Sequence, residues 1–292
     1  MDQTNFVILA IGNLGTSGDI SLKSMLSLKP KRICYLADQK GESWLIETLN
    51  RNKANSKILC QHKVNKTNYK QLQINQNLQS RYFGQEDFIR ITPLKWLVIN
   101  QSLVKHSKEK FIVFSDLDVL WLKPPKINNS KKIQIQDDSW KLTKKQHYCT
   151  GIMVWPNSAS SKKITKQIYT FQRNLIIQGN LIPDEPAFNG FINQYNTTNL
   201  ITPLNKDSFI IGHRAMALLR KEKGVLDAAT AYHANYFVGN YQKEIVLKTV
   251  LSRRNNENYW ILGCIIIYLF KVKNRITILT VKFSKGRNGK RK

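Results

Sequence analysis

The chain has 292 residues and a hydrophobic content of 42%, enough for a genuine core in one large domain or two ordinary ones. Its formal net charge of +27 predicts attraction to an anion, which leaves a nucleotide substrate, an anionic membrane surface and nucleic acid as candidates. No helix-turn-helix, zinc-finger or RNA-binding RNP pattern occurs in the sequence, so we expect no specific nucleic-acid binding.

Apolar runs alternate with helical spacings through the first half of the chain. The expected strands cover residues 5–11, 32–37, 56–60 and 111–114. The expected helices run through Leu22 and Met25, over 43–50 and over 85–106. This β-α-β-α alternation predicts an α/β fold in which helices flank a mostly parallel central sheet. The first apolar run has the features of a strand and not of a signal peptide, which favours a cytoplasmic protein.

The second half of the chain continues the alternation. We expect strands at 133–136 and 152–155, and helices at 159–178 and from Asp184 onward. No internal repeat and no long low-complexity linker interrupts the sequence. We therefore expect one domain over residues 1–255 and a separate tail over residues 256–292.

The tail places an apolar run before a basic one. Residues 260–270 carry no charge, and residues 271–292 carry nine Lys or Arg and no acid. Eleven residues are too few to span a bilayer, which takes about 20. Two interpretations stay open: a last core element with a solvated basic end, or an anchor that holds the protein on an anionic membrane surface.

The four cysteines lie far apart in the sequence and form no CxxC pair: Cys34, Cys60, Cys149 and Cys264. This spacing predicts neither a zinc site nor a disulfide framework, so the cysteines in apolar runs are interpreted as reduced core residues. Two histidines, His62 and His147, belong to no motif, and we expect both at the surface.

The segment Phe111–Pro125 holds the most informative pattern. Two carboxylates, Asp116 and Asp118, follow an apolar strand and precede a second apolar run. Buried carboxylates need a positive partner, and a divalent cation such as Mn²⁺ or Mg²⁺ is a natural one. The carboxyl ends of parallel strands are also where α/β sheets bind ligands. The alternative is a strand-to-loop turn with two solvated acids.

Four stretches together resemble the nucleotide-diphospho-sugar transferase family, and within it the plant pectin xylosyltransferases of glycosyltransferase family 77. They are Phe6–Leu28 with Cys34–Asp38, Phe88–Lys95 with Phe114–Pro124, Tyr148–Trp155 with Asp184–Asn189, and Tyr232–Lys243. The resemblance implies a GT-A-type, Rossmann-like fold, a nucleoside-diphosphate sugar donor (a UDP-sugar being the commonest), a divalent metal, and retaining transfer to a glycan or other hydroxyl acceptor.

The resemblance also implies a metal site. Asp118 corresponds to the direct metal ligand of the family, and Asp116 to a residue that contacts the metal or the ribose. His233 matches the late histidine that completes the metal sphere, and an imidazole ligand suits Mn²⁺ better than Mg²⁺. A satisfied core histidine is the alternative at that position.

The donor nucleotide is expected to contact residues from several of the same stretches: Asn13, Asp38, Lys95, Asp116, Gly239 and Lys243. The glycine would let the backbone approach the diphosphate, and the two lysines would neutralise it. Lys243 as an ordinary surface lysine is the open alternative.

Three acids are candidates for orienting the sugar or the acceptor hydroxyl. Asp184 and Glu185 stand where the family usually has Asp-Gln, so Glu185 is a departure that leaves their division of roles open. Asp184 as a helix N-cap is the alternative for that residue. Asp138, which follows an expected strand, is the third candidate, with a solvated loop acid as its alternative.

Three classes of function therefore compete. The leading hypothesis is a metal-dependent glycosyltransferase. The alternatives are a non-catalytic nucleotide- or sugar-binding relic, and a basic protein that binds nucleic acid or membrane surfaces through charge alone. Intact Asp116, Asp118 and His233 argue against a relic.

Overall fold

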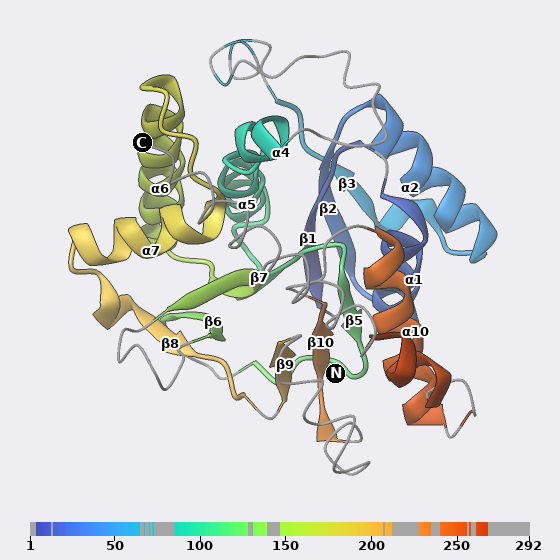
Figure 1. The fold of residues 1–292 in the computed structure, drawn as a ribbon. Coiled ribbons are helices and arrows are strands. Elements are labelled where there is room, and N and C mark those ends of the chain that lie inside the picture. The colour runs from blue at the N-terminus through green and yellow to red at the C-terminus, as the bar shows by residue number, and fades with distance from the viewer. Residues whose placement is uncertain are drawn as a thin grey trace, which may run out of the picture.

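The computed structural model describes residues 4–12, 14–64, 67, 70, 72, 85–127, 131–138, 147–206, 208–211, 228–234, 240–255, 257 and 261–267. These residues form a seven-stranded central sheet, a three-stranded second sheet and the helices that pack on them (Figure 1). The predicted mixed α/β fold with a mostly parallel central sheet is confirmed.

The central sheet has the strand order β3-β2-β1-β4-β7-β6-β8. Strand β7 runs antiparallel to both of its neighbours, whereas the pairs β1–β2, β2–β3, β1–β4 and β6–β8 are parallel. All nine residues of β7 are buried, as expected for an apolar strand covered on both faces. The strands are β1 (Asn5–Ala10), β2 (Arg32–Ala37), β3 (Leu59–Gln61), β4 (Phe111–Ser115), β6 (Ile133–Asp137), β7 (Tyr148–Pro156) and β8 (Ile201–Pro203).

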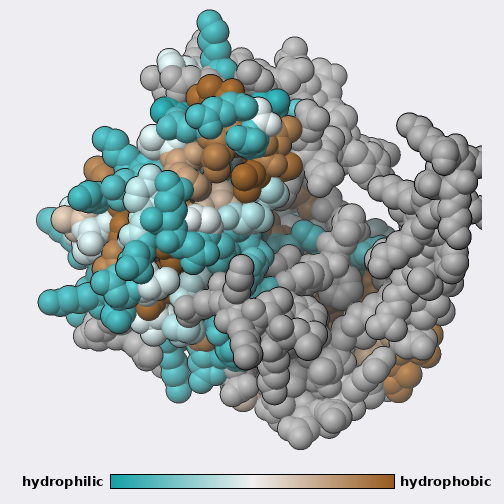
Figure 2. Space-filling model, turned by 60° about the vertical axis from the view of Figure 1, so that its left-hand side comes forward, coloured by the Kyte–Doolittle hydropathy of each residue, from teal (hydrophilic) through white to brown (hydrophobic). Residues whose placement is uncertain are grey.

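Helices cover the two faces of this sheet (Figure 1). One face packs against α4 (Gln85–Ile91), α5 (Leu94–Lys105), α6 (Ala159–Ile177) and α7 (Asp184–Gln194). The other packs against α1 (Gly15–Ser27) and α2 (Gln39–Arg51). Polar pairs join α5 to α6, since Trp96 Nε1 donates to the buried Gln172 Oε1 at 2.8 Å and Asn100 Nδ2 donates to Thr165 Oγ1 at 2.8 Å. Figure 2 shows the described part of one face as mainly hydrophilic, with hydrophobic side chains in separate groups.

The second sheet has the order β5-β10-β9, and its strand β5 follows β4 closely in the chain. It comprises β5 (Val119–Trp121), β9 (Phe209–Ile211) and β10 (Ala231–His233), and α10 (Asn240–Asn255) packs on it in a third core cluster. Two serines of α1 satisfy the backbone of β5. Ser21 Oγ donates to Val119 O at 2.7 Å, and Ser24 Oγ accepts from Trp121 N at 2.9 Å.

Several element boundaries differ from the expectation. The single helix expected over 85–106 is two helices, because Pro93 precedes α5 and lacks the N–H that a continuous helix needs. Helix α2 begins at Gln39, since the Asp38 side chain accepts from Gly41 N and starts the helix earlier than its hydrophobic spacing indicates. The strand expected over 56–60 is a short 3-10 turn, Ser56–Ile58, followed by β3.

The beginning of the tail is helical over residues 261–267. Ile267 is fully buried in the third core cluster, whereas Ile261, Leu262 and Ile265 are exposed. A Cβ on Gly263 would lie 1.9 Å from Thr249 Oγ1 of α10, so this segment is packed tightly on α10. Among the described residues, no helix is both long and apolar enough to cross a bilayer. The basic run 271–292 lies outside the described residues.

Candidate active site

The two aspartates of the sequence motif follow β4 directly. Pairing of β4 with β7 places Ser115 opposite Ile152, and the backbone N–H of Asp116 then donates to Gly151 O at 2.8 Å. Asp118 precedes β5, so the chain leaves one sheet and enters the other between these residues. The carboxylates therefore stand where a strand of the central sheet ends, as the sequence predicts.

The pairing of β10 with β5 brings His233 to this turn. His233 lies opposite Val119 in the antiparallel register, and Ala234 N donates to Asp118 O at 3.0 Å. His233 Nε2 consequently lies 3.1 Å from Asp118 Oδ1, with only 3% of the imidazole side chain exposed. On the opposite side of the ring, Nδ1 is 3.2 Å from Gln136 Oε1. A proton on Nδ1 leaves the Nε2 lone pair directed at the aspartates.

Gly151 makes room for this histidine. A Cβ on Gly151 would lie 1.9 Å from His233 Cε1, a distance that no real contact permits. The register between β6 and β7 also shifts between Ile135 and Gln136, an irregularity of the kind that re-aims side chains near active sites. The ring of His233 is thus held between Gln136, Cys149 and the backbone of β7.

Lys95, in the first turn of α5, is a buried cation at the same site. Its Nζ lies 3.2 Å from Asp116 Oδ1 and 3.3 Å from Thr150 Oγ1, and it also forms an ion pair with Asp184. Burial lowers the pKa of Lys95, but Asp116 and Asp184 outweigh burial and raise it. Lys95 therefore stays charged at neutral pH. The structure thus places Lys95 beside Asp116, and a contact of Lys95 with the donor phosphates remains a prediction.

Lys243, in the first turn of α10, contacts the other aspartate, with its Nζ 2.6 Å from Asp118 Oδ2. Burial raises the pKa of Asp118, but Lys243 and His233 outweigh burial and hold this pKa well below its usual range.

Asp116 has a different environment. Burial raises its pKa to about 6, Lys95 opposes this rise, and Asp118 and Asp184 add to it. A third of the Asp116 side chain is still exposed, so solvent moderates the effect of burial there.

The donor atoms of Asp116, Asp118 and His233 fit a divalent cation. One ligand atom from each lies within 4.8 Å of the others. Asp118 Oδ1 is buried, yet it accepts no hydrogen bond from any residue that the structure describes. Two carboxylate oxygens and one imidazole nitrogen suit Mn²⁺ or Mg²⁺, with the nitrogen favouring Mn²⁺. Burial lowers the pKa of His233, but Asp118 raises it, so a bound cation would take the place of a proton.

The three candidate acids divide between two environments. Asp184 is the first residue of α7, whose N-cap is Pro183, so it is not the capping residue. Its carboxylate accepts from Thr150 Oγ1 and pairs with Lys95. Asp138 and Glu185 instead lie together with His147, one donor atom of each within 4.8 Å of the others.

The carboxyl of Glu185 has a raised pKa. Burial raises its pKa, Asp184 adds to the rise and His147 opposes it. The expectation that His147 lies at the surface agrees with its side chain being 41% exposed.

Asp38 organises the loop after β1. Its carboxylate accepts from Gly41 N at 2.7 Å and from Gly12 N at 3.1 Å, and so joins that loop to the start of α2. Asp38 was expected to contact the donor nucleotide, but in this structure its carboxylate oxygens accept these two backbone bonds. A contact of Asp38 with the donor remains a prediction. Asn13 and Gly239, two other residues expected to bind the donor, lie outside the described residues.

Four residues that line the site were not predicted from the sequence to belong to it: Gln136, Cys149, Thr150 and Gly151. The adjacent Thr-Gly in an apolar strand was the available signal, because a glycine inside a buried strand indicates a close approach of another group. Gln136 offered no local signal, since its role depends on the register shift between β6 and β7.

Comparisons with known proteins bear on the family and on the fold of the chain. A family model described as nucleotide-diphospho-sugar transferase matches residues 53–257. No curated protein sequence matches the chain. Among solved structures, the apo-form glycosyltransferase GlyE of Streptococcus pneumoniae is 10% identical with a TM-score of 0.50, and the match covers 86% of this chain and 64% of GlyE.

Two other structures match with lower TM-scores. Mouse xyloside xylosyltransferase 1 is 11% identical with a TM-score of 0.48, over 80% of this chain and 98% of that one. A glycosyltransferase involved in glycosylation of the major capsid of PBCV-1 is 11% identical with a TM-score of 0.44, over 83% and 98%. Identities this low support the fold alone. The match over residues 53–257, on a GT-A-type fold, identifies the chain as a member of the nucleotide-diphospho-sugar transferase family.

Proposed function

We propose that this glycosyltransferase moves a sugar from a nucleoside-diphosphate sugar, most simply a UDP-sugar, to a hydroxyl of a glycan or glycosylated acceptor. The proposal includes dependence on a divalent cation, Mn²⁺ or Mg²⁺, and retention of anomeric configuration, as the resemblance to family 77 implies. Its main support is the convergence of Asp116, Asp118 and His233 from two different sheets on one point, within reach of two lysines.

The leaving group of the reaction is a nucleoside diphosphate, on which negative charge grows as the glycosidic bond breaks. A divalent cation held by Asp116, Asp118 and His233 would supply positive charge to that diphosphate. Lys243 adds a second positive group, because its side chain is 28% exposed and can turn from Asp118 towards a bound phosphate. Lys95 is 4% exposed and locked between Asp116 and Asp184, so its role is to position Asp116.

Asp138 and Glu185 are the groups proposed to hold the sugar or the acceptor hydroxyl. Both carboxyls lie beside His147 and outside the Lys95 ion-pair cluster. Their oxygens accept hydrogen bonds from sugar hydroxyls, which orients the acceptor towards the anomeric carbon. Asp184 is engaged by Lys95 and Thr150 and acts through them, as a positioning residue.

A donor screen tests the proposal directly. The purified full chain is incubated with a panel of UDP- and GDP-sugars, with Mn²⁺, with Mg²⁺ or with EDTA, and released nucleoside diphosphate is measured. We expect turnover of one donor class, lost in EDTA and restored by Mn²⁺. In a thermal-shift assay, UDP should raise the melting temperature only when the cation is present.

Matched variants separate this function from the alternatives. Asp118→Asn should abolish cation-dependent nucleotide stabilisation, whereas Glu47→Gln, at an exposed position on α2, should leave it intact. Cation-dependent nucleotide binding without turnover of any donor would indicate a binding protein. Stabilisation by any polyanion, without a cation and lost in salt, would indicate binding by charge alone and contradict the proposal.

A further inference from the structure

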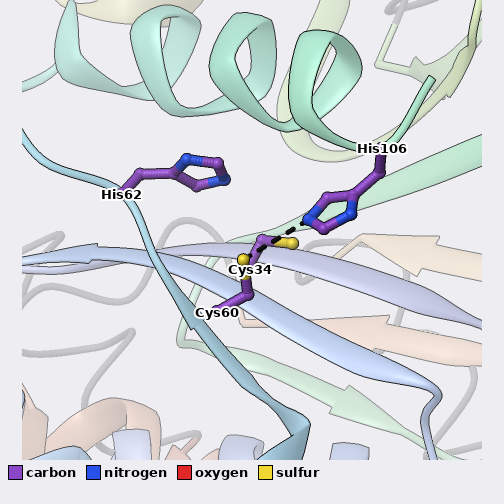
Figure 3. Close-up of side chains that lie close together, drawn as sticks. All are labelled: Cys34, Cys60, His62 and His106. Atoms are coloured by element: carbon purple, nitrogen blue, oxygen red, sulfur yellow. Dashed lines mark hydrogen bonds between the residues drawn. The ribbon is translucent and has the colours of Figure 1, made fainter.

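Two cysteines meet on neighbouring strands at the edge of the central sheet. Cys34 of β2 and Cys60 of β3 are direct partners in the parallel register, although 25 residues separate them in the chain. Cys34 is fully buried and Cys60 is partly buried. Both sulfurs point towards the face of the sheet that α5 covers (Figure 3).

Two histidines complete the group. His62 follows β3, and its backbone N–H donates to Tyr35 O at 2.7 Å, which continues the pairing with β2. His106 caps the C-terminus of α5, and its Nε2 lies 3.4 Å from Cys60 Sγ (Figure 3). One donor atom from each of the four side chains lies within 4.8 Å of the others.

This arrangement overturns one expectation from the sequence, because His62 was expected at the surface. It also groups cysteines whose wide spacing along the chain predicted no zinc site. His62 is 8% exposed, and its Nε2 lies 2.9 Å from Ser102 Oγ of α5. Spacing along the chain misleads here because strand register and helix packing, not local motif geometry, bring the four side chains together.

We propose that Cys34, Cys60, His62 and His106 bind one zinc ion at a structural site separate from the proposed active site. Two sulfurs and two imidazole nitrogens are a donor set that zinc takes in structural sites with all four positions filled by protein. Carboxylates, which magnesium and calcium prefer, are not part of the group.

The distances suit tetrahedral coordination after a small contraction. Zinc–sulfur bonds of about 2.3 Å and zinc–nitrogen bonds of about 2.0 Å place sulfur and nitrogen ligands about 3.5 Å apart. The observed 3.4 Å between Cys60 Sγ and His106 Nε2 already matches that separation. Every donor atom lies within 4.8 Å of the rest, so each remaining pair has to close by about 1.5 Å at most.

The charges around the group suit a zinc ion bound to two thiolates. Binding releases one proton from each thiol, so two thiolates and Zn²⁺ leave the buried site with no net charge.

Such a site would hold an edge strand in place. Strand β3 ends the sheet and pairs with β2 over only three residues, and the zinc would join it to the C-terminal end of α5. The opposite end of α5 carries Lys95. A helix rises about 1.5 Å per residue, so the zinc site would stand about 16 Å from that lysine and support it through one rigid element.

Metal content and cobalt spectra test the proposal on the reduced full-length chain. Zinc is measured by mass spectrometry on wild type, Cys60→Ala, His106→Asn and the matched control Cys264→Ala. We expect the first two variants to lose about one zinc per chain relative to wild type, and the control to lose none. Cobalt added to the chelated protein should give near-ultraviolet thiolate-to-cobalt absorption that disappears in the same two variants.

Further measurements distinguish zinc binding at this site from metal binding at the proposed active site and from a disulfide between the two cysteines. Asp118→Asn should leave the cobalt–thiolate absorption intact. Chelation of the wild type should lower its melting temperature, with recovery on zinc and not on magnesium, a readout that holds even if a variant fails to fold. Absence of cobalt–thiolate absorption, equal zinc in wild type and Cys60→Ala, or a Cys34–Cys60 disulfide in the protein as purified, without bound zinc, would each overturn the proposal.

Discussion

His233 Nε2 lies 3.1 Å from Asp118 Oδ1 because β10 pairs with β5 and sets His233 opposite Val119. Neither strand has more than three residues. The contact is nevertheless well supported, since Ala234 N donates to Asp118 O, and Ser21 and Ser24 bond the backbone of β5. The proposed metal site thus depends on a small second sheet that α1 holds against the large one.

Replacement of Gly151 should disrupt the site through His233. In Gly151→Ala the new methyl group would overlap the imidazole, so the ring must move away from Asp118. We expect a loss of cation-dependent nucleotide stabilisation, with a cost of about 1–3 kcal/mol in the free energy of unfolding from overpacking. Gly190→Ala in α7 is the matched control, because a methyl group there would meet no atom of the described residues within 4 Å. Equal behaviour of both variants would show that the contact with His233 has no role.

Removal of Lys243 should slow the reaction without unfolding the protein. Lys243→Ala takes a cation from the leaving group, and the loss of one such contact costs about 10²–10³ in rate. Lys248→Ala, on the same helix with its side chain paired to Glu244, should change kcat/KM little. Steady-state kinetics with the preferred donor would measure both. Normal kinetics in Lys243→Ala would confine this lysine to its ion pair with Asp118.

The buried Lys95 ion pair should show strong non-additivity. Lys95→Met leaves Asp116 and Asp184 without their buried cation, which we expect to cost about 3–5 kcal/mol of unfolding free energy. The double variant Lys95→Met with Asp184→Asn removes one orphaned charge, so it should be more stable than Lys95→Met alone. Urea denaturation of the four proteins in the cycle measures this coupling, and additive losses would contradict it.

Acid should destabilise the protein partly through Asp184. Burial raises the pKa of Asp184, but Lys95 outweighs burial and lowers it below the unfolded value. The unfolded chain therefore binds this proton at a higher pH than the native chain does. The stabilisation is complete above the unfolded pKa of about 3.9 and is lost as the pH falls through the native pKa. Asp184→Asn should flatten the dependence of stability on pH in that window, as urea titrations at a series of pH values would report.

The start of the tail should contribute to the core. Ile267→Ala removes a fully buried side chain from the third core cluster and should cost about 2–5 kcal/mol. Ile265→Ala, at a position that is 53% exposed, should stay within about 0.5 kcal/mol of wild type. If Ile261, Leu262 and Ile265 meet a membrane, replacing them with serine should reduce sedimentation with anionic liposomes without a loss of stability. A stable Ile267→Ala would contradict the core assignment.

The sequence by itself determined the elements whose signals are local. Apolar runs predicted β1, β2, β4 and β7, and the aspartates at the end of β4 predicted a ligand site at a strand terminus. The resemblance of Tyr232–Lys243 to the family motif implied that His233 and Lys243 belong to that site, and both contact Asp118. These signals are readable because side-chain period, strand termini and motif order are properties of the linear chain.

Only the tertiary structure decided which polar groups share a partner. Lys95 is buried against Asp184 because α5 and α7 pack on the same face of the sheet, so Asp184 is not the helix cap that the sequence allowed. Cys34 and Cys60 meet because β2 and β3 pair in one register, and a shift of one residue would turn one of the sulfurs to the opposite face. Register and packing arise from contacts between distant segments, and no spacing along the chain encodes them.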